Sequence, residues 1–387
     1  MPKVGLGVNL AKNQSKELKI LKIILWSYII LCIVIAGVKY GYASKATPEV
    51  NAIVTNVWHF YENWVKTIFI IVCSILTLRI VKKSKRTIMR KRNLIGLIIT
   101  ALIVHIIVPL LLGNSELYLF AMPLPWTTKP LQLLSPNTTF YQSKYAIWGT
   151  AGISAILIFY VCVSIIVLIG TLLFGRRWQC STICLFNGFA SEIFAPVIPL
   201  IGKNTATCQS DVCTNKKLSS KTLMIFNILR WVFLAIAIFF TVLCILFLAG
   251  VSLPVNFDII SNIELFKYLC TELLVAMFFW VALTQRGYCY YCPLGTVLAF
   301  ISKFAGQKIT TANSKCIQCN QCNMSCPMSI DIKSLAAAGK DVKEMRCVGC
   351  GHCVDACPTK TLAYSTRFIQ RFIVSNKRKN RTNSLDL

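Results

Sequence analysis

Six long apolar stretches run through the 387-residue chain, and they limit the folds that it can adopt. Hydrophobic residues make up 56% of the sequence and charged residues 14%, whereas an ordinary soluble domain is about 25% charged. A helix needs roughly 20 mostly apolar residues to cross the hydrocarbon core of a bilayer. Stretches near this length lie at 20–40, 65–81, 94–112, 146–174, 223–252 and 264–284. The sequence therefore predicts a mostly α-helical protein with a bundle of six transmembrane helices.

Lysine and arginine residues concentrate in alternate loops between these stretches. The segment through Lys22 has five, 79–92 has eight, 176–221 has six, and the part from Arg286 onward has fifteen. Because cytoplasmic loops retain Lys and Arg, we expect a cytoplasmic (inner) membrane protein with both termini in the cytoplasm. The same segregation accounts for the net charge of +27. It favours the lipid bilayer as the partner and argues against nucleic acid.

The first apolar stretch has two interpretations. It follows Lys16, Lys19 and Lys22 and ends near small residues, as a cleaved secretory signal does. Its apolar run, 23–38, is longer than the core of most such signals. We therefore expect an uncleaved membrane anchor.

The C-terminal part of the chain repeats one cysteine spacing, C-x2-C-x2-C-x3-C-P. The first run comprises Cys316, Cys319, Cys322 and Cys326, and the second comprises Cys347, Cys350, Cys353 and Cys357. This is the spacing of bacterial two-cluster ferredoxins, in which the fourth cysteine of each run ligates the other [4Fe-4S] cluster. Cluster I is thus assigned to Cys316, Cys319, Cys322 and Cys357, and cluster II to Cys347, Cys350, Cys353 and Cys326. Zinc sites and disulfide frameworks do not require the third cysteine or the trailing proline.

Two further cysteine pairs follow predicted membrane spans in matching positions. Cys180 and Cys184 come after the fourth span, and Cys289 and Cys292 after the sixth. In the reducing cytoplasm, clustered cysteines more often bind metal or carry out redox chemistry than form structural disulfides. Two interpretations stay open: the four thiols converge on an additional metal centre or redox dithiol, or they are unliganded thiols at helix ends.

These observations predict four segments. Residues 1–145 form a three-span membrane region with an outer loop, and 146–305 form a second three-span region with the paired cysteines. Residues 306–366 form a small α+β ferredoxin domain of bacterial type with two [4Fe-4S] clusters, and 367–387 form a basic tail.

The combination of paired cysteines at helix ends with a two-cluster ferredoxin resembles the membrane-bound ferredoxin-type proteins of the NapH and NosR group. The resemblance covers roughly residues 146–365. The chain differs from the family pattern, which is C-x3-C-P in both pairs: Leu185 follows the first pair, and the second pair is C-x2-C-P. The resemblance implies electron transfer between the quinone pool and a respiratory or maturation partner.

The sequence leaves the exact role open. The protein is expected to be an electron-transfer subunit of the quinol dehydrogenase type, and whether it is itself an enzyme stays undecided. The alternative is a maturation or regulatory protein that reduces a metal or cofactor for another enzyme; a subunit with inert clusters is a third class. His105 lies inside a predicted span. An ionisable side chain at membrane depth is a candidate for quinol chemistry, although a hydrogen bond to a neighbouring helix explains it equally well.

Overall fold

The computed structural model describes nearly all of the membrane helices and the ferredoxin region. The described residues are 11–42, 47–82, 88–111, 113, 118, 123, 150–201, 218–248, 251, 256–284, 286–311 and 316–372. The outer loop predicted before residue 146 and most of the basic tail lie outside these ranges.

Four helices in the described part of the chain are long and apolar enough to cross a membrane. They are Lys16–Tyr42, Pro48–Val81, Ile88–Leu111 and Ser220–Leu243. The first joins α1 (Ala11–Ala36) to η2 (Gly37–Tyr42), and the third joins α4 (Ile88–Leu102), η5 (Ile103–Ile107) and α5 (Val108–Leu111). The fourth belongs to α10 (Ser220–Leu248). These helices correspond to the first, second, third and fifth predicted spans.

The fourth and sixth predicted spans are also helical. Helix α8 (Thr150–Phe174) covers the fourth, while α11 (Phe257–Phe266), η9 (Lys267–Leu274) and α12 (Val275–Ala282) run consecutively through the sixth. Within α8, the side chains are described only for the apolar part Ile158–Phe174. The mostly helical character is therefore confirmed with four spans, and the count of six stays a prediction.

The second membrane helix is longer than the sequence predicted. It runs through α2 (Pro48–Phe60), η4 (Tyr61–Val65) and α3 (Lys66–Lys82), whereas the predicted span began at residue 65. Polar residues lower the local hydropathy before that point, yet their side chains find partners inside the bundle. Glu62 Oε2 accepts from Lys66 Nζ at 2.8 Å, one turn further along the same helix. His59 and its aromatic neighbours Trp58, Phe60 and Tyr61 therefore belong to this continuous helix.

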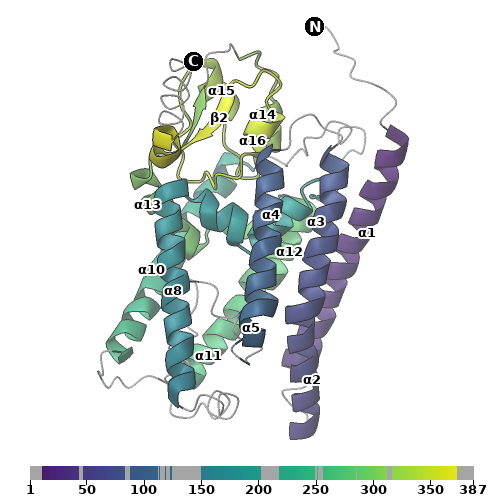
Figure 1. The fold of residues 1–387 in the computed structure, drawn as a ribbon, viewed down its shortest axis with the longest axis vertical. Coiled ribbons are helices and arrows are strands. Elements are labelled where there is room, and N and C mark those ends of the chain that lie inside the picture. Colours follow the sequence, from purple (N-terminus) through teal and green to yellow (C-terminus); the bar gives the residue numbers. More distant parts are fainter. Residues whose placement is uncertain are drawn as a thin grey trace, which may run out of the picture.

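The ferredoxin region lies at one end of the bundle, as Figure 1 shows. Strands β1 (Lys308–Thr311) and β2 (Leu362–Ser365) pair antiparallel, with Lys308 opposite Ser365. Three short helices complete the region: α14 (Gln321–Ser325), α15 (Ile332–Ala337) and α16 (His352–Ala356). Before this region, α13 (Pro293–Phe304) packs against α8 and α10. After α8, η7 (Trp178–Ile183) and α9 (Asn187–Ile193) lie beneath the ferredoxin.

The ferredoxin region is hydrogen-bonded directly to the bundle. The first turn of α4 donates from the backbone N–H groups of Met89 and Arg90 to the carboxylate of Asp355, at 3.2 and 3.0 Å. A negative side chain at this position satisfies free donors and complements the helix dipole. Asn93 Nδ2 donates to the carbonyl oxygen of Cys350 at 2.9 Å. The two regions thus share a bonded interface.

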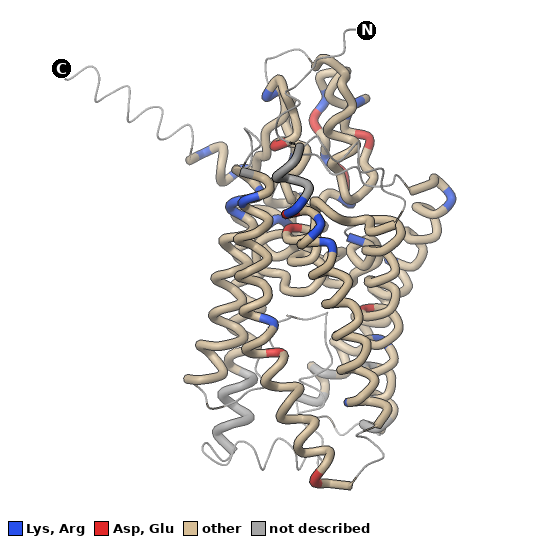
Figure 2. The backbone as a smooth tube through the Cα atoms, turned by 90° about the vertical axis from the view of Figure 1, so that its right-hand side faces the viewer, with Lys and Arg blue, Asp and Glu red and all other residues tan. Residues whose placement is uncertain are grey.

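Charge follows the same division of the molecule. Figure 2 shows Lys and Arg gathered where the bundle meets the ferredoxin and within the ferredoxin itself, while most of the lower bundle carries neither sign. The lower bundle also exposes large apolar side chains such as Ile165, Ile228 and Phe239. An apolar belt below a basic end is the surface expected of a membrane protein.

Candidate metal centres

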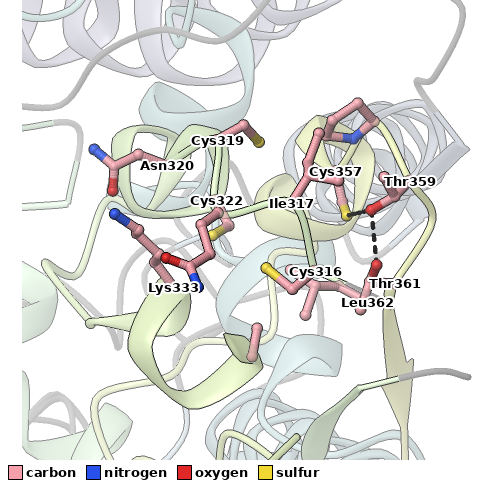
Figure 3. A pocket seen from close by; sticks show the side chains of 13 residues that line it. Cys316, Ile317, Cys319, Asn320, Cys322, Lys333, Cys357, Thr359, Thr361 and Leu362 are labelled. Carbon is pink, nitrogen blue, oxygen red and sulfur yellow. Dashed lines mark hydrogen bonds between the residues drawn. The ribbon is translucent and has the colours of Figure 1, made fainter. Parts of the chain in front are cut away.

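The four cysteines assigned to cluster I surround one pocket. Cys316, Cys319, Cys322 and Cys357 line it, and Figure 3 shows their sulfurs arranged around a common space. Cys319 is exposed, and the side chain of Ile317 beside it is 61% exposed. Cluster I would therefore lie near the surface of the molecule.

The four cysteines assigned to cluster II line a second pocket, which is more deeply buried. Cys326, Cys347, Cys350 and Cys353 surround it, together with apolar side chains that include Ile309, Val342 and Val348. The fourth cysteine of each run lies with the other run's three, as the crossed ligation pattern requires. Each pocket offers four thiols to a [4Fe-4S] cluster, so the donor sets fit two such clusters.

The two cysteine runs fold alike but face different surroundings. In each run, the residues two and four places after the first cysteine have positive φ: Gln318 and Asn320 in the first, Gly349 and Gly351 in the second. A Cβ on Gly351 would lie 2.7 Å from the Met89 Cβ atom. Only glycine fits this left-handed backbone so close to α4. The second run therefore faces the bundle. The first run has larger residues, Gln318 and Asn320, at the two equivalent positions.

The paired cysteines come together beneath cluster II. Cys180 belongs to η7, Cys184 ends it, and Cys289 and Cys292 flank the turn before α13. Cys180, Cys289 and Cys292 are each 8% exposed and share one buried cluster of side chains. Burial raises the pKa of Cys184 to about 12, so a metal that bound there would have to displace protons.

Arginine side chains are buried around these pairs. Arg176 is 1% exposed, and its Nε atom donates to Cys180 Sγ at 3.3 Å. Arg286 is fully buried, and its Nη1 atom donates to the carbonyl oxygen of Cys180 at 2.7 Å. Each arginine shortly precedes a cysteine pair in the sequence, Arg176 before Cys180 and Arg286 before Cys289.

Glu192 is a functional candidate that the sequence analysis missed. It is fully buried in α9, where Oε1 accepts from Arg286 Nη2 at 3.0 Å and Oε2 lies 2.9 Å from His352 Nε2. His352 stands between Cys350 and Cys353. Burial alone would raise the pKa of Glu192, but His352 and Arg286 outweigh burial and lower it to about 2. The available signal was a lone acidic residue inside the apolar stretch 189–200.

His105 has the structural partner that the sequence analysis considered. Its Nδ1 atom lies 2.7 Å from the carbonyl oxygen of Glu62 on the neighbouring helix, and its ring stacks on Tyr118. The hydrogen bond between helices explains its burial.

In the described part of the chain, no group of three or more His, Cys, Asp or Glu side chains is arranged to hold a single metal ion. This finding includes the eight ferredoxin cysteines. The thiolates of a [4Fe-4S] cluster bind different iron atoms, so they need not meet at one point.

Comparison with known proteins agrees with this geometry. Residues 315–362 match the 4Fe-4S dicluster domain family. The chain is 31% identical to the ferredoxin-type protein NapH of Haemophilus influenzae over 102 residues, 25% of this chain and 36% of that protein. It is also 33% identical to the putative electron transport protein YccM of Escherichia coli, over 24% of its own length and 25% of YccM.

An uncharacterized protein of Methanocaldococcus jannaschii is 28% identical over 108 residues, 27% of this chain and 42% of that protein. The chain thus covers less than half of the length of each of these relatives. No solved structure matches it. The predicted resemblance to NapH-like ferredoxins is confirmed, and so are the two [4Fe-4S] clusters. The chain therefore combines a two-cluster [4Fe-4S] domain with helices long and apolar enough to cross a membrane.

Proposed function

We propose that the protein passes electrons between quinol in the cytoplasmic membrane and a respiratory partner in the cytoplasm. The observation that carries this proposal is the unequal surroundings of the two cysteine pockets. The cluster II pocket is apolar and faces the bundle, whereas the cluster I pocket opens beside exposed Cys319. When bound, the clusters supply one-electron steps. In this arrangement, cluster II would exchange electrons with the membrane side and cluster I with a docking protein.

The basic end of the bundle supports a cytoplasmic ferredoxin. Lys and Arg gather on the side that carries the clusters (Figure 2), and cytoplasmic flanks retain these residues. The partner would then meet cluster I on the cytoplasmic side, with both termini in the same compartment. The alternative partner is an enzyme whose metal or cofactor is reduced during maturation, which the same exposed cluster could serve.

A quinol site needs a proton acceptor close to the electron path. Glu272 in η9 is 7% exposed and lies 3.6 Å from Lys267 Nζ, and its Oε1 atom accepts from Tyr288 Oη at 3.4 Å. Tyr288 directly precedes Cys289 in the chain. An ionisable pair at this depth is a functional candidate. We place the quinol head group near Glu272, below the paired cysteines.

Oxidation of quinol beside Glu272 releases two electrons and two protons as quinol becomes quinone. The electrons leave one at a time toward the ferredoxin, and the Glu272 carboxylate accepts one proton at a time and releases it to water. The reverse sequence reduces quinone.

The test is quinol-driven reduction of the clusters in membrane vesicles, followed by EPR. Glu272→Gln should lower the rate by about 100-fold, the lower end of typical general acid–base contributions, with both clusters intact. Glu49→Gln, an exposed acid in α2, is the matched control and should leave the rate unchanged. A wild-type protein whose clusters accept electrons from dithionite but never from quinol would refute the quinol role and favour maturation.

A further inference from the structure

We propose that Cys180, Cys184, Cys289 and Cys292 bind a third [4Fe-4S] cluster at the junction between the bundle and the ferredoxin. This inference deepens the proposed function, on which its role as an electron relay rests. Each thiol loses one proton as it becomes a ligand, so four protons are released on assembly.

The two cysteine pairs meet. Cys180, Cys289 and Cys292 belong to one cluster of buried side chains. Cys184 ends η7, four residues after Cys180, and is close enough to Cys180 and Cys289 for both to affect its pKa. The two pairs are more than 100 residues apart in the chain, yet they lie close together in the fold. The fold thus gathers four thiols from two loops, which is the donor set of a cluster of this type.

The backbone folds closely around the sulfur of Cys184. The backbone N–H groups of Phe186 and Gly188, two and four residues on, lie close to Cys184 Sγ, and a Cβ on Gly188 would be 3.5 Å from that sulfur. Cys326, a predicted ligand of cluster II, has the backbone N–H groups of Met328 and Ile330 close by at the same two positions. Hydrogen bonds to sulfur tune iron–sulfur clusters. Cys184 therefore has the same backbone surroundings as a predicted cluster ligand.

The second pair has this feature as well. Gly295 N donates to Cys292 Sγ at 3.2 Å, and Pro293 follows Cys292 as Pro327 follows Cys326. A Cβ on Gly295 would lie 2.5 Å from Arg176 Nη2. The missing side chain lets the guanidinium lie directly against this loop.

Two buried arginines beside these thiols call for a negative charge nearby. Arg176 is 1% exposed and has no carboxylate partner among the described residues. Its side chain bonds instead to Cys180 Sγ and to the carbonyl oxygen of Met345. Arg286 is fully buried, and within the described chain its Nε atom has no hydrogen-bond partner. Buried cations need an anion nearby. Glu192 compensates one of the two, and four thiolates around an iron–sulfur cube would compensate the other.

The position of this centre suits a relay to cluster II. Ser181, next to Cys180, donates from Oγ to the carbonyl oxygen of Val348 at 3.2 Å. Arg176 reaches the carbonyl oxygen of Met345 at 3.0 Å. Both carbonyls are within two residues of Cys347, a predicted ligand of cluster II. The third cluster would therefore lie between the Glu272 region and cluster II.

The test is the metal content of the full-length protein, purified from membranes without oxygen. Three clusters predict about twelve iron and twelve sulfide atoms per chain, against about eight for the ferredoxin alone. The double variant Cys184→Ser/Cys292→Ser should lose about four iron atoms and keep both ferredoxin EPR signals, because serine retains the cap of α13. The matched control is Cys162→Ser, which removes an exposed thiol of α8.

Each outcome is decisive. Wild-type protein with about eight iron atoms and one zinc would overturn the cluster in favour of a zinc site, and eight iron atoms without another metal would leave only free thiols or a disulfide. Both results come from the wild type and hold even if the variant fails to fold. Twelve iron atoms with no quinol activity would support the cluster while refuting the proposed function.

Discussion

Replacing Glu192 with glutamine tests whether one buried carboxylate holds the ferredoxin on the membrane bundle. The carboxylate lies 3.0 Å from Arg286 Nη2 and 2.9 Å from His352 Nε2. Arg286 belongs to the bundle side and His352 to the ferredoxin side. Glutamine has nearly the same shape but no charge, so it leaves the Arg286 cation buried without its carboxylate.

The expected magnitude follows from burial. Glu192 and Arg286 are both fully buried, and removing one partner of such a pair costs about 3–5 kcal/mol. Since every 1.4 kcal/mol is about a tenfold change in an equilibrium, the population with an undocked ferredoxin should rise by a factor on the order of one hundred to a few thousand. Undocking exposes the apolar pocket of cluster II.

Iron release to a chelator measures this population, because the chelator reaches cluster II only in the undocked state. The detergent-solubilised Glu192→Gln protein should release cluster II iron at least about 100-fold faster than the wild type. Glu344→Gln is the matched control. Its side chain is 45% exposed and lies 3.9 Å from Arg346, and exposed pairs contribute about 0–1 kcal/mol. If both variants released iron at the same rate, the reasoning about Glu192 would be wrong.

Three further predictions concern the sites themselves. Cys322→Ser should abolish the EPR signal of cluster I and Cys326→Ser that of cluster II, because the fourth ligands cross over; loss of one shared signal in both variants would contradict this. Gly295→Ala should cost about 1–3 kcal/mol in thermal unfolding through overpacking against Arg176, and an unchanged melting temperature would contradict the close contact. The pKa of Glu192 is lowered to about 2, so its stabilisation of the docked state is complete above the unfolded carboxyl pKa of about 4.3 and is lost as pH falls toward 2. The difference in iron release between wild type and Glu192→Gln should therefore shrink below about pH 4. A difference that stayed constant with pH would refute the ion pair.

Some features were predictable because their signal is local. The spacing of the cysteine runs indicates the cluster type directly, since three of the four ligands of each cluster come from one short loop. Long apolar stretches likewise indicate membrane helices. The grouping of Cys326 with the second run also followed from the motif, and the pocket that it lines with Cys347 agrees.

Other features depended on contacts between distant residues. The helix Pro48–Val81 extends through a polar stretch because Lys66 pairs with Glu62 inside the bundle, and hydropathy counts both as charges. Glu192 meets His352 across 160 residues, so no spacing rule relates them. The meeting of Cys184 with Cys289 was left open for the same reason, since the order of helices in a bundle is not visible in their composition.

The cap on α4 ties the completion of a membrane helix to iron. Asp355 accepts from the first turn of α4, 265 residues earlier in the chain. It sits between Cys353 and Cys357, one predicted ligand from each cluster, so it reaches α4 only after the loops around both have formed. A chain made without iron would insert into the bilayer with this end of α4 unbonded and open to proteases. Iron supply would then determine how much of the whole protein the membrane retains.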